Sequence, residues 1–545
     1  MQVFVLFLTA LFITMVTVPL LMKLAGRLRF VDAPGPRKVH TAVIPRVGGI
    51  GMVLGTVVAV TLWLEVDSTF RVIFLGIGVL SLFGIADDRC DLDYRLKFLG
   101  QIVAVLIVVV GGQVVIRRIG ILGIEALPDW FAYPLTIVFV LGTTNAMNLS
   151  DGLDGLAAGL SVLSLACIAY LAEMADGEAV VAMAIATIGA LFGFLRYNTH
   201  PAVVFMGDTG SQFLGFTAGV LSVLVTQEVN TVISGTLPLL ILGLPVVDTL
   251  LVMGDRLSRG VSPFKPDRNH FHHKLLGLGF DHYEAVLAIY GLQAMFVLLA
   301  FFLRYEADAV VLAVYGLLFG GLAVFFPVVY GLRWRIRAKV SAMGGKSPVA
   351  RWVDYLIHSR RAERLVFIGV MAVLLTLFLA GSIATATVGR DIGFCAFGVL
   401  ACWVLLTVTP ARAVPIERLA LYSCVVLNVF LIVTNGSLQP KLERGGSFLV
   451  IGLAVMVGLG VRLSRRYFSV TPSDFLVLFI LLAAASLPMF SGVNYARLAV
   501  EAAVVLYGVE YVLRRLEGPS LLLRAGGMLT LAVLTARGLG AGLMT

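Results

Sequence analysis

The chain has 545 residues, of which 59% are hydrophobic and 13% are charged, and its 41 basic and 32 acidic side chains give a net charge of +9. The charged share is about half of the usual quarter, and the apolar residues lie in blocks long enough to cross a bilayer about 30 Å thick. This composition excludes a soluble enzyme, a secreted disulfide scaffold, a disordered chain and a nucleic-acid-binding protein. The positive charge is weak evidence for a polyanionic partner, because membrane proteins commonly carry basic cytoplasmic loops.

The first part of the chain is predicted to form eleven transmembrane helices, because backbone polar groups cannot stay unpaired in lipid. The predicted spans cover residues 3–26, 47–65, 70–86, 98–116, 131–148, 156–172, 179–195, 211–226, 232–254, 284–303 and 307–331. The first block lacks a basic flank before it and a small-residue cleavage site after it, so we expect a retained span rather than a signal peptide.

Alternate loops differ in charge: those on one side of the predicted membrane contain 14 Lys or Arg residues and those on the other side contain four. The positive-inside rule places the basic loops in the cytoplasm and the N-terminus outside. The unusual polar clusters also lie in these basic loops. A transporter would place ionisable residues near mid-membrane, often in two repeats. The pattern therefore favours a membrane enzyme that takes a soluble substrate from the cytoplasm.

Several carboxylates lie at or near the ends of predicted spans. Asp87 and Asp88 are adjacent at the end of the third span, and such a pair can hold a hard cation or share a proton, although an isolated pair is more often a solvated turn. Asp208 lies between glycines before the eighth span, where it either caps the helix with Ser211 or faces a metal while the helix N-terminus faces a phosphate. Asp248 lies inside the ninth span and is interpreted as supporting or structural.

Four oxygen-bearing side chains recur every three residues in NAMNLSDGLDGLAAG: Asn145, Asn148, Asp151 and Asp154. On a helix, this spacing places them on one face. Hard oxygen ligands of this kind suit Mg²⁺ and phosphate, and the glycines between them leave room for a bulky ligand or a break in the helix. Helix capping by Asn and Asp is the alternative, but capping requires only one such residue.

Two further loops are rich in cations and histidine. Residues 254–280 contain Arg268, His272 and His273 among other basic residues, which would repel a metal but suit a diphosphate. The segment RKVHTAVIPRVGGIG contains His40 and Arg46 and, by itself, is an ordinary positive-inside loop. Together the clusters indicate Mg²⁺ bound to a diphosphate and phosphoryl transfer, in which metal and cations stabilise the transferring charge.

Five ordered motifs give the chain a family resemblance: RKVHTAVIPRVGG, ADDRCDLDYRLKFLGQ, NAMNLSDGLDGLAAG, VFMGDTGSQFLG and DRNHFHHKLL. The chain resembles the polyprenyl-phosphate N-acetylhexosamine-1-phosphate transferases of glycosyltransferase family 4, and most of all the bacterial enzymes that act on UDP-N-acetylglucosamine and undecaprenyl phosphate. The resemblance implies that the lipid phosphate attacks the β-phosphate of the UDP-sugar and that UMP leaves. It implies an inner-membrane enzyme that starts O-antigen, common-antigen or teichoic acid synthesis with its active site facing the cytoplasm.

The resemblance also implies roles for individual residues. The implied catalytic set is Asp87, Asp88, Asp151, Asp154 and His272. The implied ligands of Mg²⁺, with Mn²⁺ as an alternative ion, are Asp208 and Asn148. The implied substrate-binding set is Lys97, Arg268, His273, Asn145, His40 and Arg46. A lipid phosphate that is already ionised needs little deprotonation, so we expect positioning or metal-linked roles for Asp87 and Asp88 rather than a general base.

The domain organisation predicted from these patterns is a transferase core at 1–331, a basic amphipathic cytoplasmic linker at 332–364, and a C-terminal transmembrane region at 365–545. Six spans are expected in that region, near 365–388, 391–409, 416–434, 447–462, 474–489 and 494–513, with a doubtful seventh at 519–541. No catalytic cluster occurs there. The region either handles the lipid product or serves as a scaffold or homodimer contact.

Two other functions are compatible with parts of the pattern. A phospho-N-acetylmuramoyl-pentapeptide transferase would use the same chemistry, but it carries a different histidine-rich loop. A polytopic transporter of lipid-linked sugars belongs to another class, and its transport would survive loss of Asp87 or Asp208. The expected partners are therefore a UDP-N-acetylhexosamine, undecaprenyl phosphate and the lipid bilayer, with no nucleic acid.

Overall fold

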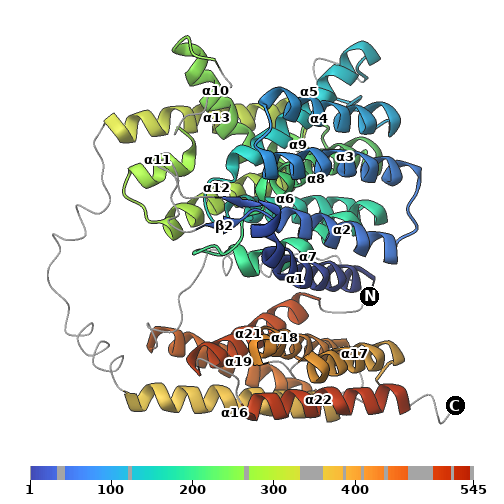
Figure 1. Ribbon diagram of the computed structural model, residues 1–545, viewed down its shortest axis with the longest axis vertical. Coiled ribbons are helices and arrows are strands. Elements are labelled where there is room, and N and C mark those ends of the chain that lie inside the picture. The colour runs from blue at the N-terminus through green and yellow to red at the C-terminus, as the bar shows by residue number, and fades with distance from the viewer. Residues whose placement is uncertain are drawn as a thin grey trace. The chain divides into compact units, whose positions relative to one another are not determined.

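The computed structural model describes residues 2–32, 43–120, 126–262, 269–331, 360–384, 388–406, 410–434, 440–463, 495–516 and 521–540. In these ranges helices predominate, and the strands are a short antiparallel pair, β1 (Val31–Asp32) and β2 (Ile44–Pro45). The described residues form two compact units (Figure 1). The first runs from α1 (Gln2–Leu28) to α13 (Asp308–Gly331), and the second from α16 (Arg360–Ala384) to α22 (Leu521–Gly540).

The remaining helices of the first unit correspond closely to the apolar blocks of the sequence. They are α2 (Gly48–Trp63), α3 (Ser68–Cys90), α4 (Tyr94–Leu106) with the π-helical turn η1 (Ile107–Gly111), α5 (Asp129–Ser150), α6 (Leu156–Glu173), α7 (Glu178–Asn198), α8 (Gly207–Leu224) with the π-helical turn η2 (Val225–Val229), α9 (Pro238–Ile241), α10 (Gly243–Ser258), α11 (Phe271–Gly277) and α12 (His282–Phe302). Ten helices of the described residues, nine in this unit, are long and apolar enough to cross a membrane. The prediction of an all-α multi-pass membrane protein is confirmed.

Helix α8 lies at the centre of the first unit. In the most apolar 18-residue stretch of this helix every residue is buried, whereas in the corresponding stretch of α13 only 17% of the residues are buried. Glycines allow this central helix to approach its neighbours: a Cβ on Gly49 of α2 would lie 2.2 Å from the backbone nitrogen of Gly210, and one on Gly84 of α3 would lie 2.7 Å from the Cα of Thr209. Small residues permit such close helix contacts in membranes. The first turn of α8 is therefore packed closely between α2 and α3.

The predicted ninth span, 232–254, is not one continuous helix. Prolines and glycines divide it into α9 and α10, with Leu242 between them outside helical geometry. The side chain of Gln293, on α12, accepts a hydrogen bond from Leu244 N (3.1 Å) and donates one to Ile241 O (2.8 Å). Ser164 of α6 also donates to Ile241 O, at 2.8 Å. A broken helix is tolerated at membrane depth when protein groups satisfy the freed backbone in this way.

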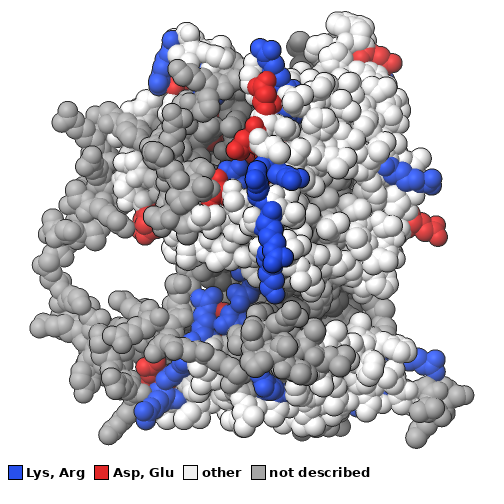
Figure 2. Space-filling view, in the orientation of Figure 1, with Lys and Arg blue, Asp and Glu red and all other residues white. Residues whose placement is uncertain are grey.

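The face shown in Figure 2 is largely uncharged over the described residues. Broad areas of it carry neither acidic nor basic side chains, and a strip of charged groups runs beside these areas, with a few more at the edge of the view. Exposed large apolar residues occur along α2, α3, α12 and α13, among them Leu62, Leu82, Phe302 and Leu317. Such exposure would promote aggregation in water but is expected where helices face acyl chains.

The second unit contains, besides α16 and α22, the helices α17 (Arg390–Leu406), α18 (Pro410–Thr434), α19 (Pro440–Leu463) and α21 (Tyr495–Arg515). Its core includes the fully buried Trp403 and Phe378 and aliphatic side chains from all six helices. The doubtful stretch 519–541 forms α22, which is a membrane-span candidate. The predicted span 474–489 lies outside the described residues, as does the predicted linker up to residue 359; its last five residues open α16.

Candidate active site

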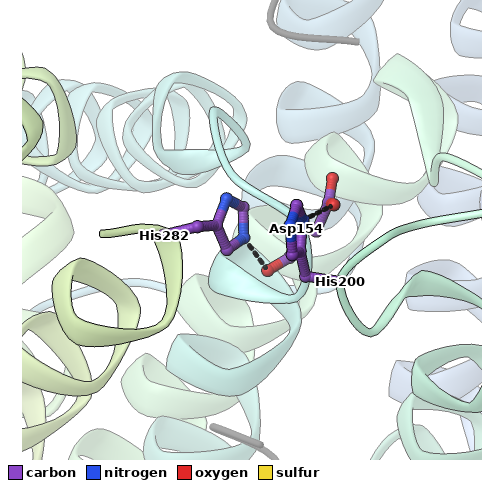
Figure 3. Close-up of side chains that lie close together, drawn as sticks. All are labelled: Asp154, His200 and His282. Carbon is purple, nitrogen blue, oxygen red and sulfur yellow. Dashed lines mark hydrogen bonds and ion pairs between the residues drawn. The ribbon is translucent and has the colours of Figure 1, made fainter. Parts of the chain in front are cut away.

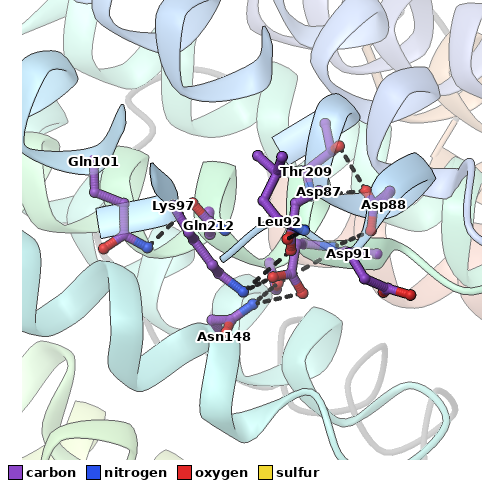
Figure 4. A network of polar contacts seen from close by, with 12 residues as sticks. Asp87, Asp88, Asp91, Leu92, Lys97, Gln101, Asn148, Thr209 and Gln212 are labelled. Atoms are coloured by element: carbon purple, nitrogen blue, oxygen red, sulfur yellow. Dashed lines mark hydrogen bonds and ion pairs between the residues drawn. The ribbon is translucent and has the colours of Figure 1, made fainter. Parts of the chain in front are cut away.

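The first turn of α8 is held by a carboxylate from α3. Asp88 is only 5% exposed. Its Oδ1 accepts a hydrogen bond from Asp208 N (2.7 Å), and its Oδ2 accepts bonds from Thr209 N (3.1 Å) and Thr209 Oγ1 (2.7 Å), as Figure 4 shows. A carboxylate at a helix N-terminus is stabilised by the free amides and the helix dipole. These contacts make Asp88 a positioning residue for Asp208, and the bonded amides are not free for a phosphate.

Gly207 permits this arrangement. Its φ of +69° is in the left-handed region, and a Cβ there would lie 2.4 Å from Asp88 Oδ1. Only glycine adopts this conformation without strain. The glycine before Asp208 is thus required both by the backbone and by the approach of Asp88.

Four predicted site residues converge next to this turn. The ammonium of Lys97, on α4, lies 3.3 Å from Asp87 Oδ2 and forms an ion pair with Asp208 (Figure 4). Asn148 Nδ2, at the end of α5, donates to Asp208 Oδ1 at 3.2 Å and to Ser211 Oγ at 2.7 Å. The other oxygen of Asp87 accepts a bond from Leu92 N at 2.8 Å. Residues far apart in the sequence therefore form one cluster, as predicted.

An amide layer lies beside this cluster. Gln101, on α4, is 1% exposed; its Nε2 donates to Gln212 Oε1 at 3.2 Å, and its Oε1 accepts from Asn145 Nδ2 at 2.8 Å. Asn145 also donates to the backbone oxygen of Leu141. Asn145, predicted to bind substrate, thus fixes α5 against α4, and Gln101 in turn contacts Gln212 of α8. Gln101 and Gln212 were not among the predicted residues, although a glutamine inside an apolar block is a recognisable signal.

The four-residue stripe from Asn145 to Asp154 does not lie on one helical face. Helix α5 ends at Ser150, and Asp151 is its C-cap with φ −81° and ψ 57°. The chain turns through Gly155, whose φ is +78°. Because glycine has no Cβ, the backbone can leave helical geometry here without a steric penalty. Asn148 therefore faces Asp208, while Asp154 faces a different group of residues. The expected single stripe is therefore wrong for its last two members.

Asp151 is partly exposed at the surface and lies beside other acids. Burial, together with the negative charges of Asp154 and Asp88, raises the pKa of Asp151 to about 7, against an opposing effect from Arg46. A carboxyl group with such a pKa is only partly ionised near neutral pH. Asp151 is therefore suited to gain charge when a cation approaches.

Asp154 contacts two histidines that were not predicted. Its Oδ2 lies 2.6 Å from His200 Nδ1 and accepts a bond from Ala202 N at 3.0 Å. The rings of His200 and His282 stack with centroids 3.9 Å apart (Figure 3). Isolated histidines in separate loops give no spacing signal, because only the fold brings the loop before α8 to the start of α12.

The histidine-rich segment packs against the α5–α6 turn. A Cβ on Gly152 would lie 2.3 Å from His272 Nε2, so that imidazole lies directly on the Gly152 backbone. Burial, with His273 and His270 nearby, lowers the pKa of His272 to about 3. His272 is therefore neutral near pH 7 and supplies no positive charge for a diphosphate. His273 lies against it, with ring centroids 4.2 Å apart.

Asp248 supports this segment from α10. Its Oδ2 lies 3.0 Å from His270 Nδ1, and its Oδ1 accepts a bond from Phe271 N at 2.9 Å, at the start of α11. The structural interpretation of this intramembrane carboxylate thus agrees with its contacts. Both groups of the pair are buried, so each satisfies the other's polar atoms.

Arg46 links three segments at the edge of the site. It forms an ion pair with Asp32 of β1, and its NH1 lies 3.4 Å from Asp91 Oδ1. The neighbouring backbone is paired with the loop before α8, since Phe205 N donates to Pro45 O at 2.8 Å. Arg46 was predicted to bind substrate, and its described contacts are with carboxylates of the chain. His40 and Arg268, also predicted to bind substrate, lie outside the described residues.

The cluster around Asp208 fits a magnesium ion chemically. Carboxylates from α3 and α8 and the side-chain amide of Asn148 offer hard oxygen atoms, which Mg²⁺ prefers. The ammonium of Lys97 already contacts both Asp87 and Asp208, so this position accepts a positive charge.

The chain is similar to several known proteins. The family model described as glycosyl transferase family 4 matches residues 70–226. A probable undecaprenyl-phosphate N-acetylglucosaminyl 1-phosphate transferase of Bacillus subtilis is 36% identical over 305 residues, covering 56% of this chain and 85% of that protein. An undecaprenyl-phosphate alpha-N-acetylglucosaminyl 1-phosphate transferase of Escherichia coli K12 is 33% identical over 277 residues, covering 49% and 74%. A decaprenyl-phosphate N-acetylglucosaminephosphotransferase of Mycobacterium tuberculosis H37Rv is 34% identical over 316 residues, covering 52% and 78%.

Proposed function

The chain belongs to glycosyl transferase family 4, and we propose that it transfers N-acetylglucosamine 1-phosphate from UDP-N-acetylglucosamine to undecaprenyl phosphate. The convergence of Asp87, Lys97, Asn148 and Asp208 from four helices carries this proposal. The names of the related proteins support the sugar phosphate and the polyprenyl acceptor. The UDP portion of the donor is the part implied by the family resemblance of the five ordered motifs.

In the proposed reaction an oxygen of the lipid phosphate forms a bond to the β-phosphorus of the donor. The bond from that phosphorus to the bridging oxygen breaks, and UMP leaves with the bridging oxygen. Positioning and charge stabilisation supply most of the catalysis in such transfers. Asp88 and Gly207 fix the first turn of α8, and Asn148 holds the carboxylate of Asp208 toward Lys97. Lys97 is placed to interact with a phosphate oxygen.

We expect Mg²⁺ to be held by Asp208 and Asp87, with Asn148 as a further oxygen donor. When bound, it would neutralise the diphosphate and stabilise the charge that develops on the leaving group. His272, being neutral, would take part through hydrogen bonding, so the positive charge for the donor would come from lysine and arginine side chains.

We place the reaction at the cytoplasmic face of a bacterial inner membrane, with the N-terminus outside. The excess of Lys and Arg in the loops that contain the cluster supports this orientation. Nucleotide sugars are cytoplasmic substrates, whereas the acceptor phosphate lies at the membrane surface. A site at the cytoplasmic ends of apolar helices would meet both.

A doubly labelled donor tests the proposal. Membranes containing the full chain would receive UDP-N-acetylglucosamine labelled with ³²P at the β-phosphate and ¹⁴C in the sugar, together with undecaprenyl phosphate and Mg²⁺. Both labels should enter the lipid fraction in equal amounts while UMP is released. Membranes containing Asp208→Asn at equal protein level serve as the control. Transfer of ¹⁴C without ³²P, or release of UDP, would contradict sugar-phosphate transfer.

Three related measurements test the alternative functions and the metal requirement. Incorporation from UDP-N-acetylmuramoyl-pentapeptide in place of UDP-N-acetylglucosamine would assign the chain to the peptidoglycan-precursor enzymes. Movement of a lipid-linked sugar across vesicles that survives Asp208→Asn, without any incorporation of ³²P, would assign it to transport. Membranes treated with EDTA should lose incorporation and regain it with Mg²⁺.

A further inference from the structure

A second group of potential metal ligands lies apart from the Asp208 cluster. It comprises Asp154 in the turn before α6, His200 in the loop before α8, and His282 at the first position of α12 (Figure 3). One ligand atom from each side chain lies within 4.8 Å of the other two. Among the residues that the structure describes, no other group of three His, Cys, Asp or Glu side chains meets this spacing.

The contacts of His200 and His282 exceed what a hydrogen-bonded pair requires. The bond between His200 Nδ1 and Asp154 Oδ2, at 2.6 Å, would be sufficient to satisfy those two groups. The imidazole of His282 nevertheless lies parallel to His200, with 19° between the planes, and its Nε2 is 3.4 Å from the backbone oxygen of Asp154. Two imidazoles this close repel each other when both are protonated. A bound cation replaces those protons and uses both rings.

The surrounding hydrogen bonds fix the backbone of the segments that carry His200 and His282. Asp281 and Glu284 form a reciprocal capping box at the start of α12, with bonds of 2.9 and 2.8 Å. Tyr283 Oη donates to the backbone oxygen of His200 at 2.7 Å. Ligands held by a second layer of hydrogen bonds bind metal more tightly. The three segments are therefore already assembled around the group.

The donor set selects a different cation from the one expected at Asp208. Two imidazole nitrogens and one carboxylate suit Zn²⁺ or a similar transition metal, whereas Mg²⁺ prefers oxygen throughout. Side-chain exposures of 37% for His200 and 18% for Asp154 leave the group accessible from solvent. Tetrahedral zinc, with bonds of about 2.1 Å, lies in the plane of each imidazole that binds it, so one of the two stacked rings has to turn when the metal binds.

We propose that Asp154, His200 and His282 form a transition-metal site of the zinc class that ties the turn before α6 and the loop before α8 to the start of α12. Metal coordination would fix the Asp154 carboxylate and hold the turn that carries Asp151. The inference depends on this juxtaposition alone and not on the proposed transferase reaction.

Zinc binding by the full-length protein in detergent tests the proposal. The chain would be stripped with EDTA, titrated with Zn²⁺ against a chromophoric chelator, and analysed for metal by mass spectrometry. We expect one zinc per chain, and a loss of affinity of roughly tenfold or more in His200→Gln and His282→Gln. His270→Gln is the matched control, because His270 also contacts an aspartate but belongs to no group of three; it should bind zinc like the wild type.

The outcomes separate cleanly. Zinc uptake by the wild type that does not exceed that of the His200→Gln, His282→Gln double variant would overturn the proposal, as would an equal loss in His270→Gln. Should either histidine variant fail to give a monodisperse protein, X-ray absorption of zinc on the wild type decides. A first shell with two imidazoles supports the site, and any other imidazole number refutes it. Failure of the labelled-donor assay would leave this result unaffected.

Discussion

The two units of the molecule handle buried charge in different ways. In the first unit, Asp87 and Asp208 share the ammonium of Lys97, and Asp151 lies beside further carboxylates. In the second unit, two acidic residues have basic partners of their own: Glu417 lies 2.7 Å from Arg524, and Glu510 contacts Arg514, Arg418 and Tyr422. An excess of carboxylates prepares a site for a cation, whereas balanced pairs hold helices together.

Removal of the Asp208 carboxylate from the cluster of the first unit should lower the rate of transfer more than any other change considered. Asp208→Asn is expected to lower transfer by at least roughly a thousandfold, because charge stabilisation at the reacting groups is lost. The protein should still insert into membranes, since its amide can keep the contact with Asn148. Glu510→Gln, a matched change in the second unit, should retain transfer. Activity of Asp208→Asn within tenfold of the wild type would exclude this residue from the reaction centre.

Gly207→Ala tests the scaffold rather than the charge. The new Cβ would lie 2.4 Å from Asp88 Oδ1 on a backbone with φ +69°, so the first turn of α8 must shift. Misplacement by about 1 Å can cost on the order of a hundredfold in rate. Gly78→Ala on α3, where a Cβ meets no atom within 4 Å, is the control and should be silent in the transfer assay. Equal rates for the two variants would show that Asp88 does not position α8.

Arg524→Gln sharpens the contrast from the second unit. It leaves the Glu417 carboxylate, 1% exposed, without its partner, and breaking such a pair costs about 3 kcal/mol of unfolding free energy. We expect a lower unfolding temperature in detergent and unchanged transfer per folded molecule. The Glu417→Gln, Arg524→Gln double variant should recover part of the loss, because no buried charge remains. A double variant less stable than both single variants would argue against a structural pair.

The smallest expected effect concerns Asp151. Its pKa of about 7 in the folded protein lies above the value of about 3.9 for an unfolded chain, so the folded state binds more protons between these values. Stability of the metal-free protein should therefore fall as pH rises through this window. The unfolding temperature of the wild type should fall between about pH 5 and about pH 8, and in Asp151→Asn this fall should be smaller by a few degrees. Identical pH profiles for the two proteins would show that the pKa of Asp151 is not raised in the folded state.

The amino-acid pattern alone was enough to predict the membrane class, because runs of apolar residues reveal spanning helices directly. It also identified Asp87, Asp88, Lys97, Asn148 and Asp208 as one group, since each lies at the end of a predicted span on the same side. The break in the ninth span was harder to predict from the sequence. Pro238 and Gly243 weaken a helix, but the hydrogen bonds from Gln293 and Ser164 that make the break acceptable come from other helices.

Sequence therefore determined the membrane class and predicted which polar residues lie together. Tertiary structure decided what each side chain contacts: Asp88 caps a helix of another segment, Asp154 faces His200, and His272 is buried and neutral. The physical reason is that apolar periodicity and charge bias are local properties of a chain. Desolvation and hydrogen-bond pairing instead depend on neighbours that only the folded backbone brings within a few ångströms.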